Sequence, residues 1–433
     1  MIARMVHGTA GFEAALAELR DRGESDFTRV ESVVREILGD VKSGGDAAVL
    51  RHVERLEKRT PKALFRRDYG GAAALARLSK DAREALEYAA DRIARFHERE
   101  RSSMFANDGF RYEEGGVSLG LRARPLAKVG VYAPGGKARY PSSVLMSAVP
   151  ARVAGVREII LATPLAGDAS DDVVLAAAHV AGVTAVVDAG GAQAIGALAF
   201  GTASVPRVDK IVGPGNAYVA CAKRLVYGAV AIDSIAGPSE ILVVADGTGD
   251  PAIIAADLLS QAEHDEDAYP LLVCLSEELV ARVDAELETQ LSDLPRAAIA
   301  RESLRRNGRA FVVADRDALA RVADDIAHEH LALHVESPEE MAMDVRNAGA
   351  VFVGALTPEA AGDYVAGPSH VLPTGGVVRF GSPLGVHDFV ARTSLIRYSA
   401  DALRRDERTI GVLARLEGLE AHARAVGIRT RGL

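Results

Sequence analysis

Apolar residues recur at helical spacing through the first hundred residues of the chain. The pattern is clearest in FTRVESVVREILGDVKSG and DAREALEYAADRIARFHERER, and the pairs Gly44-Gly45 and Gly70-Gly71 interrupt it. The sequence therefore predicts a helical N-terminal region, of which residues 1–28 form an N-terminal helical arm.

From residue 126 onward, short apolar runs alternate with helical segments. The runs LAKVGVYA, REIILAT, VTAVVDA and VDKIVG are each followed by a helical pattern. After SEILVVAD the alternation resumes with YPLLVCL, RAFVVAD, LALHVE and GAVFVG. Such alternation implies right-handed crossovers and parallel sheets covered on both faces. We expect an α/β fold with two Rossmann-like parallel-sheet domains, one inserted in the other, and with helical N-terminal and small C-terminal extensions.

The same pattern gives the expected domain boundaries. Residues 29–131 plus 239–383 should form one discontinuous α/β domain, and residues 132–238 the inserted one. Residues 384–433 should form a C-terminal tail, because they contain no clear βαβ unit. Within that tail, VLARLEGLEAHARAVGIRT has the pattern of a helix that ends near Gly427.

Composition narrows the class of protein. The 433 residues include 48% hydrophobic and 26% charged residues, which is typical of a soluble globular protein. The net charge is −9 and no Lys/Arg block occurs, so a surface for nucleic acid or anionic membranes is not indicated. No apolar run could cross a bilayer and the N-terminus lacks a signal-peptide core, so we expect a cytoplasmic protein without membrane partners. Cys221 and Cys274 could form one disulfide, but two reduced, partly buried thiols fit this location better.

The histidines are concentrated in the second half of the chain. Seven of the eleven follow residue 260: His264, His328, His330, His334, His370, His387 and His422. Several stand beside carboxylates, as in QAEH, HEH and EGLEAH. Imidazole and carboxylate groups together are the usual ligands of zinc and also the usual general bases.

Taken singly, these polar groups have ordinary structural explanations. Gln261 and His264 are three apart on an expected helix, which suits one metal, yet such pairs are more often surface polar groups. Asp363 precedes a glycine-containing loop, where an Asp is usually a cap or turn residue. Glu329-His330 lies where a helix gives way to a strand, and His328 leaves open which imidazole would act.

Glycine turns form a second cluster of candidates. Three expected strands end in Pro134-Gly135-Gly136, Gly190-Gly191 and Gly213-Pro214-Gly215-Asn216, each before a helix. Free N–H groups at such helix starts can bind an anion such as pyrophosphate. None of the turns matches G-x-G-x-x-G, so they indicate a ligand at the strand ends no better than they indicate simple tight turns.

In combination, these segments closely resemble the histidinol dehydrogenase family from about Lys128 to the C-terminus, and more loosely before it. The resemblance rests on YAPGGKARYPSSVLM, GGAQAIGALAFGT, VDKIVGPGNAYV, AGPSEILVVAD, DLLSQAEH, HEHLAL, NAGAVFVG, GDYVAGPSHVLPTGG, RFGSPLGVHDFV and EGLEAH. It implies an NAD-dependent, four-electron oxidation of L-histidinol to L-histidine through L-histidinal, in the last steps of histidine biosynthesis. It also implies that the discontinuous domain binds zinc and substrate and that the inserted domain binds NAD.

The resemblance assigns roles to individual residues. One zinc per subunit would be held by Gln261, His264, Asp363 and His422. Glu329 and His330 would be the acid/base pair. The substrate would meet the zinc ligands and His330, together with Ser239, His370 and Glu417. The NAD-binding site would be lined by Tyr132, Gln193 and Asn216. The family's enzymes are homodimers in which the tail reaches the partner's active site, so Glu417 and His422 would act in trans.

Two positions depart from the family's pattern. His328 stands where the family usually has proline, and Ser369 stands where it commonly has asparagine, which could loosen hydrogen bonding around the site. Two other functions remain open. Some relatives oxidise other alcohols such as sulfopropanediol, although RFGSPLGVHDFVARTS and EGLEAH favour the histidinol type. The chain could also be a catalytically idle zinc- or ligand-binding protein on the same scaffold.

Overall fold

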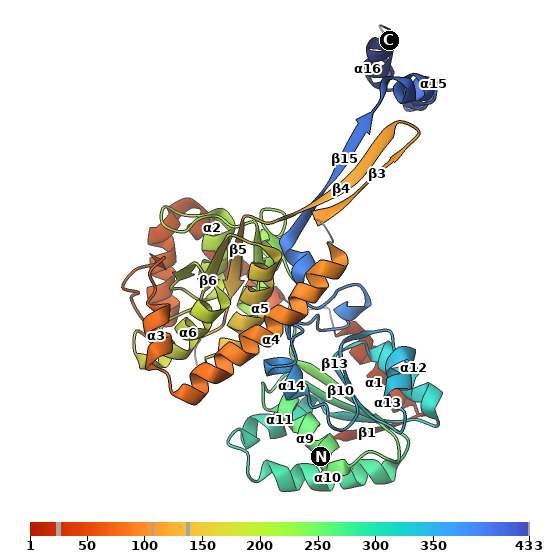
Figure 1. The fold of residues 1–433 in the computed structure, drawn as a ribbon. Helices are drawn as coiled ribbons and strands as arrows, with labels where there is room; N and C mark the ends of the chain where they lie inside the picture. The colour runs from red at the N-terminus through yellow and green to blue at the C-terminus, as the bar shows by residue number, and fades with distance from the viewer. Residues whose placement is uncertain (23–26, 106–107, 136–138, 432–433) are drawn as a thin grey trace.

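The computed structural model describes residues 1–22, 27–105, 108–135 and 139–431. Its ribbon shows two α/β units and a long arm that carries the C-terminus (Figure 1). Gly136 of the first expected glycine turn lies outside the described residues.

One six-stranded sheet, which we call the host sheet, is built from both ends of the chain. Its order is β1-β12-β11-β10-β13-β14, and every pair of neighbours is parallel. The strands are β1 (Ala3–Val6), β10 (Glu240–Ala245), β11 (Tyr269–Cys274), β12 (Arg309–Val312), β13 (His328–His334) and β14 (Ala348–Val353). One face packs on α9 (Pro251–Ala262), α10 (Glu277–Leu291) and α11 (Ala297–Asn307). The other packs on α1 (Ala10–Asp21), α12 (Arg316–Ile326) and α13 (Pro338–Asp344).

The second six-stranded sheet, the inserted sheet, has the order β2-β7-β6-β5-β8-β9. The strands are β2 (Phe65–Arg66), β5 (Lys128–Tyr132), β6 (Glu158–Ala162), β7 (Ala185–Val187), β8 (Lys210–Val212) and β9 (Ala231–Ile232); only β2 is antiparallel. One face is covered by α3 (Gly71–Arg77), α4 (Lys80–Met104), α5 (Pro141–Ala154) and α6 (Asp172–Ala181). The other is covered by α2 (Thr28–His52), α7 (Gly191–Phe200) and α8 (Ala217–Val226). A π-helix, Val53–Glu57, follows α2.

The arm is a three-stranded antiparallel sheet that ends in two helices (Figure 1). Its strands, in the order β15-β4-β3, are β3 (Gly109–Glu114), β4 (Val117–Pro125) and β15 (Val390–Tyr398). Beyond β15 follow α15 (Ala400–Leu416) and α16 (Glu420–Thr430). The segment that leads from β14 to the arm contains α14 (Glu359–Tyr364) and two 3-10 turns, Val377–Arg379 and Val386–Phe389.

The two nested parallel-sheet units confirm the expected fold class, but the packing corrects the expected boundaries. Residues 29–131 were assigned together with 239–383, yet α2 packs on α7 and α8, α3 on α6, and α4 on α5. The inserted unit therefore begins at α2 and ends at β9. Helical periodicity shows which face of α2 or α4 is apolar, but it does not show which sheet covers that face.

The two ends of the chain also differ from expectation. The N-terminal segment is not only helical, because β1 pairs with β12 before α1 begins. The expected helix through Gly427 is two helices, since Gly418 takes a left-handed conformation (φ 74°) that ends α15. Residues 109–125, expected in the discontinuous domain, form the strands that pair with the tail.

Cys221 and Cys274 are both buried and free, as expected, and burial raises the pKa of the Cys274 thiol to about 11. Among the described residues, no helix has the length and apolar character that crossing a membrane requires.

Candidate active site

The candidate catalytic residues lie where the two sheets are linked. Residues 233–239 connect the carboxyl end of β9 in the inserted sheet with the amino end of β10 in the host sheet. Glu329 and His330 stand at the amino end of β13, the neighbour of β10. The expected NAD residues follow the carboxyl ends of strands in the inserted sheet. The short link therefore brings these two edges together.

His330 is buried and held in one tautomer. Its Nδ1 lies 2.9 Å from the backbone carbonyl oxygen of Glu240. A carbonyl only accepts, so Nδ1 carries the proton and the lone pair of the neutral ring is on Nε2. Burial lowers the pKa of His330, which keeps the ring neutral and able to accept a proton.

Glu329 lies beside His330, also buried. Its Oε2 accepts a hydrogen bond of 2.9 Å from the backbone N–H of Glu240 and is 3.6 Å from His330 Nδ1. Burial, followed by the charge of the Glu240 carboxylate, raises the pKa of Glu329 well above its usual value. A carboxyl with a raised pKa can give and take a proton near neutral pH.

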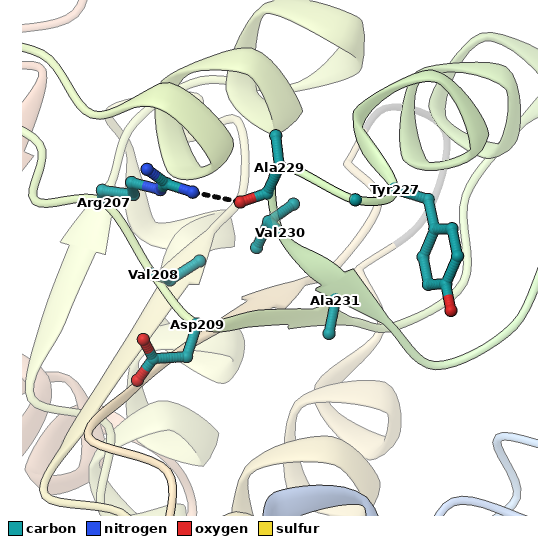
Figure 2. A pocket seen from close by; sticks show the side chains of 8 residues that line it. Arg207, Val208, Asp209, Tyr227, Ala229, Val230 and Ala231 are labelled. Atoms are coloured by element: carbon teal, nitrogen blue, oxygen red, sulfur yellow. Dashed lines mark hydrogen bonds between the residues drawn. The ribbon is translucent and has the colours of Figure 1, made fainter. Parts of the chain in front are cut away.

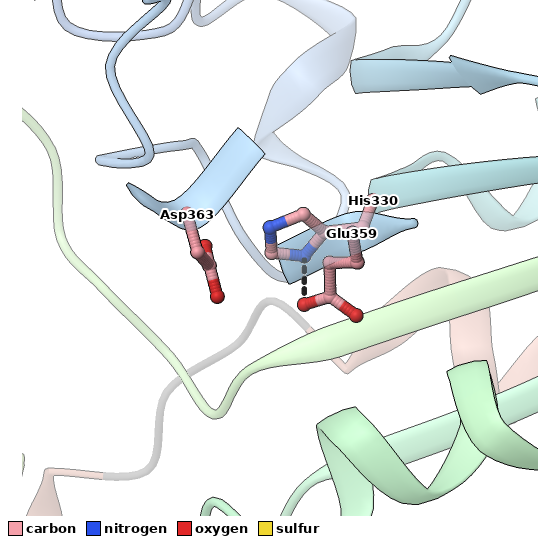
Figure 3. A group of neighbouring side chains, drawn as sticks. All are labelled: His330, Glu359 and Asp363. Carbon is pink, nitrogen blue, oxygen red and sulfur yellow. Dashed lines mark ion pairs between the residues drawn. The ribbon is translucent and has the colours of Figure 1, made fainter. Parts of the chain in front are cut away.

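Glu359 and Asp363 complete a cluster with His330 (Figure 3). One ligand atom from each of the three residues lies within 4.8 Å of the others. Glu359 is 2% exposed; its Oε2 accepts from Ser260 Oγ at 3.1 Å, and its Oε1 is 3.6 Å from His330 Nδ1. Within the described chain, that Oε1 has no hydrogen-bond partner. Glu359 was not among the residues predicted from the sequence, although its position four residues before Asp363 places both on one face of α14.

The Asp363 carboxyl is surrounded by imidazoles. Its Oδ1 lies 3.5 Å from His370 Nδ1. Burial alone would raise the pKa of Asp363, but the contact with His370, and after it the positive charge that His330 or His264 carries when protonated, holds that pKa below its usual value. His264 is therefore near the cluster, and Asp363 is the ionised member of the group.

Gln261 and His264 approach the cluster from α9. Gln261 is 1% exposed, and its Oε1 has no hydrogen-bond partner in the described part of the chain. His264 is exposed and stands just beyond the end of α9 at Ala262, not within the helix as expected. Its N–H still donates to the Gln261 carbonyl at 3.1 Å, so the chain continues its helical path for that turn.

This donor set fits zinc. The buried side-chain amide oxygen of Gln261 and one buried carboxylate oxygen of Glu359 lack partners in the described part of the chain, and an uncompensated buried polar atom is costly unless a ligand meets it. Asp363 and His264 add a carboxylate and an imidazole, so the site offers the nitrogen and oxygen ligands that zinc accepts.

Ser239 and His370, two of the residues expected to meet the substrate, lie on two loops that are joined by a hydrogen bond. Ser239 directly precedes β10 and is partly buried. The neighbouring Gly237 N–H donates to Thr374 Oγ1 at 2.6 Å, which ties this link to the loop that carries His370. Ser239 and His370 thus belong to segments that are hydrogen-bonded to one another.

The three expected NAD residues share the carboxyl edge of the inserted sheet. Tyr132 ends β5, Gln193 lies in the first turn of α7, and Asn216 caps α8 by accepting from the N–H groups of Tyr218 and Val219. The Tyr132 hydroxyl accepts from Gly191 N–H at 3.1 Å, and burial raises its pKa to about 12, so it stays neutral.

Glu57 occupies the start of α7. One of its oxygens accepts from Gly190 N–H at 2.9 Å and from Gln193 Nε2 at 3.0 Å. This leaves the oxygen of the Gln193 amide buried and without a partner among the described residues. A carboxylate therefore stands at the start of α7, whereas the start of α8 is capped by the neutral side chain of Asn216.

A surface pocket of about 640 Å³ lies elsewhere, beside β8 and β9 (Figure 2). It is lined by Arg207, Val208, Asp209, Tyr227, Gly228, Ala229, Val230 and Ala231. The Arg207 guanidinium donates to the Ala229 carbonyl, and no expected site residue is present. It is not the candidate active site.

Comparison with known proteins decides the family. The sequence model of the family described as Histidinol dehydrogenase matches residues 20–430. The chain belongs to the histidinol dehydrogenase family. A histidinol dehydrogenase of Geobacter metallireducens is 49% identical over 424 residues, covering 97% of this chain and 96% of the relative. One of Syntrophotalea carbinolica is 50% identical over 422 residues, covering 97% of each. The crystal structure of histidinol dehydrogenase from Elizabethkingia anophelis matches with a TM-score of 0.91 at 33% identity, covering 100% of this chain and 98% of the other.

Within this member of the histidinol dehydrogenase family, the two tail residues do not join the cluster of their own chain. Glu417 and His422 are exposed, and they lie on α15–α16 at the far end of the arm (Figure 1). The other expected zinc residues, Gln261, His264 and Asp363, lie together in the host unit.

The two departures from the pattern of histidinol dehydrogenases are both buried and paired. The Ser369 hydroxyl donates to the Met146 carbonyl at 3.0 Å and accepts from Val371 N–H at 3.1 Å. His328 Nδ1 lies 3.2 Å from Glu240 Oε2, and burial lowers the pKa of His328 to about 4, so the ring is neutral. The Ser369 hydroxyl is therefore hydrogen-bonded as both donor and acceptor, and His328 Nδ1 is hydrogen-bonded to the Glu240 carboxylate.

Proposed function

We propose that the chain oxidises L-histidinol to L-histidine through L-histidinal, with NAD as the oxidant and one zinc ion per subunit. The observation that carries the proposal is the buried imidazole of His330, which lies against Glu329 and the donor cluster and whose Nδ1 proton is bound to the Glu240 carbonyl, so that Nε2 is the nitrogen able to accept a proton. Membership of the histidinol dehydrogenase family supports the choice of substrate.

Gln261, His264 and Asp363 would hold the zinc ion, with His422 of a second copy as the fourth ligand. When bound, zinc would supply a fixed point of attachment for the imidazole and amine of the substrate. Ser239, His370 and Glu417 of the second copy would make further substrate contacts. His370 also keeps Asp363 ionised, which strengthens that carboxylate as a ligand.

His330 would act as general base in the alcohol step. Its Nε2 takes the hydroxyl proton, because Nδ1 already carries a proton bound to the Glu240 carbonyl. NAD would accept the hydride that leaves the same carbon in each of the two oxidations. Tyr132, Gln193 and Asn216 would line its site at the edge of the inserted sheet.

Glu329 would serve the aldehyde step. Hydration of histidinal requires the removal of a proton from water, and the raised pKa of Glu329 suits a carboxyl that accepts such a proton. Both residues are buried, so histidinal held against them would be shielded from bulk water between the two steps.

The arm supports the proposal of a homodimer, which we place in the cytoplasm as the usual site of amino-acid biosynthesis. Large apolar side chains are exposed along it, among them Phe110 (60%), Ile396 (69%) and Leu416 (78%). Such side chains on a projecting element are typical of a surface that another chain covers. A second copy would also bring Glu417 and His422 to the cluster.

Addition of L-histidinol to the purified protein with NAD and zinc should produce NADH, followed by absorbance, and L-histidine, identified by mass spectrometry. Formation of NADH from sulfopropanediol but not from histidinol would mean that histidinol is not the substrate. If a zinc-loaded and folded protein forms no NADH with either alcohol, the result would favour the alternative that the chain is a catalytically idle zinc- or ligand-binding protein.

A further inference from the structure

Glu240 holds both members of the proposed acid/base pair through its own peptide groups. It is the first residue of β10 and is 1% exposed. Its N–H donates to Glu329 Oε2 and its carbonyl accepts from His330 Nδ1, each at 2.9 Å. The orientation of two side chains therefore depends on the placement of one residue of the main chain.

The Glu240 carboxylate is itself fixed by groups from three other segments. Oε1 accepts from Arg22 Nε at 2.7 Å and from Gly375 N–H at 3.0 Å. Oε2 accepts from Arg22 Nη2 at 2.8 Å and lies 3.2 Å from His328 Nδ1. His328 Nδ1 is equally far from Arg22 Nη2, but only the carboxylate can accept, so we assign the His328 proton to Oε2.

Arg22 joins this carboxylate to the strand of the acid/base pair. Its guanidinium, 3% exposed, also donates to the carbonyls of Ile326 at 2.8 Å and Ala327 at 3.2 Å. Those residues lead directly into β13, which begins at His328. The bidentate pair thus connects the end of α1 with the first residues of both β10 and β13.

The negative charge of the buried Glu240 carboxylate is balanced by the positive charge of Arg22. Burial opposes ionisation, but the Arg22 guanidinium and the His328 hydrogen bond hold the pKa of Glu240 at about 2. A buried carboxylate and guanidinium tolerate burial only while they remain paired, so the loss of either leaves an uncompensated charge beside the pair.

We infer that Glu240, clamped by Arg22, Gly375 and His328, is the positioning residue for the acid/base pair Glu329 and His330. It does not react itself, and the inference rests on the proposed function. His328, at the position where the family usually has proline, supplies a donor to this carboxylate that a proline cannot supply. The clamp makes Arg22, at the end of α1, a support of the active site, although its hydrogen bonds in the described part of the chain reach Glu240 and not Glu329 or His330.

The test is the variant Glu240→Gln, which keeps the shape of the side chain but loses the charge and one acceptor. We expect kcat on L-histidinol to fall about 10²-fold, the usual consequence of misplacing a catalytic group by about 1 Å. KM for histidinol and NAD should change less than about threefold, because the proposed binding groups are retained. The zinc content, measured by elemental analysis, should not change.

Asp284→Asn is the matched control. Asp284 on α10 also binds the N-terminal segment, through the Met1 amine at 2.9 Å and Arg4 Nη2 at 3.5 Å. None of its hydrogen bonds in the described residues reaches Glu329 or His330. We expect it to lower thermal stability and to keep kcat within about twofold of wild type. His328→Pro removes the imidazole donor and the backbone N–H of residue 328 but leaves the Arg22 and Gly375 contacts of Glu240, so it should lower kcat less than Glu240→Gln does.

A folded, zinc-loaded Glu240→Gln protein with wild-type kcat would overturn the inference. If that variant does not fold, Arg22→Lys replaces it: the charge remains and the bidentate contact is lost, so kcat should fall at unchanged KM, and a wild-type kcat would again refute the clamp. If the wild-type protein does not oxidise histidinol, the proposed function fails, and the clamp is then judged by crystallography alone. Glu329 and His330 should be displaced in Arg22→Lys, and side chains that stay in place would refute it.

Discussion

A mixture of two inactive variants should regain activity if the active site is shared between subunits. In one chain, Gln261, His264 and Asp363 belong to the host unit, whereas Glu417 and His422 are exposed on the arm (Figure 1). His264→Ala removes a ligand from the host unit, and His422→Ala removes one from the arm. Each homodimer therefore lacks one zinc ligand at both of its sites and should be inactive.

The size of the recovery follows from counting sites. In a mixed dimer, the host unit of the His422→Ala chain meets the arm of the His264→Ala chain, and this site has every ligand. The other site of the same dimer lacks two. If equal amounts of the two chains pair at random, about half of the dimers are mixed and the mixture should show about a quarter of wild-type activity.

The assay would unfold the two variants together, refold them, load zinc and follow NADH formation. Wild-type protein taken through the same cycle gives the reference, and native mass spectrometry counts the mixed dimers. If mixed dimers form and no activity returns, His422 serves its own subunit or is not a ligand, and the proposal of a shared site is wrong.

Three further outcomes are expected. Removal of metal with a chelator should abolish NADH formation and zinc should restore it; full turnover by protein shown to be metal-free would contradict the zinc proposal. Glu329→Gln should slow the oxidation of histidinal more than that of histidinol, since only the aldehyde step needs activated water, and equal losses on both substrates would remove its assigned role. The Glu100 carboxylate accepts from His97 at 2.6 Å and from Val386 N–H at 3.1 Å. Burial would raise the pKa of this carboxyl, but its contacts with His387 and His97 lower that pKa from 4.5 to about 2. The stabilisation that ionised Glu100 provides is present above pH 4.5 and is lost as the pH falls toward 2, so the free energy of unfolding should drop by on the order of 3 kcal/mol across this range. In Glu100→Gln, the free energy of unfolding measured by denaturant titration should drop less over the same range.

The parallel strands could be predicted from the sequence because their apolar runs are continuous. Ile241 to Ala245 in β10 are all fully buried, which is the pattern of a strand covered on both faces. β4 and β15 escaped prediction because their side chains are mostly exposed or partly exposed, and their residues alternate without a continuous apolar run. β1 has only four residues and depends on β12 for its hydrogen bonds.

The candidate site was predictable only in part. Residues that belong to recognisable motifs, such as Gln261, His264 and Glu329, could be named from the resemblance. Glu359 and Glu240 could not, because each stands as a single acidic residue whose role depends on neighbours distant in sequence. Glu240 contacts Arg22, which is 218 positions away, and no local pattern records that pairing.

The pairing of β1 with β12 has a consequence for the order in which the protein can form during synthesis. Ala3 pairs with Arg309, so β1 has no neighbour on the emerging chain until 306 further residues (309 − 3) have been made. The inserted unit, from α2 to β9, is complete well before then and can fold as a domain on the emerging chain. The N-terminal segment must remain undocked throughout this interval. We therefore expect docking of β1 and α1 to come late in folding, and the catalytic edge of the host sheet to be the last part of the subunit to become ordered.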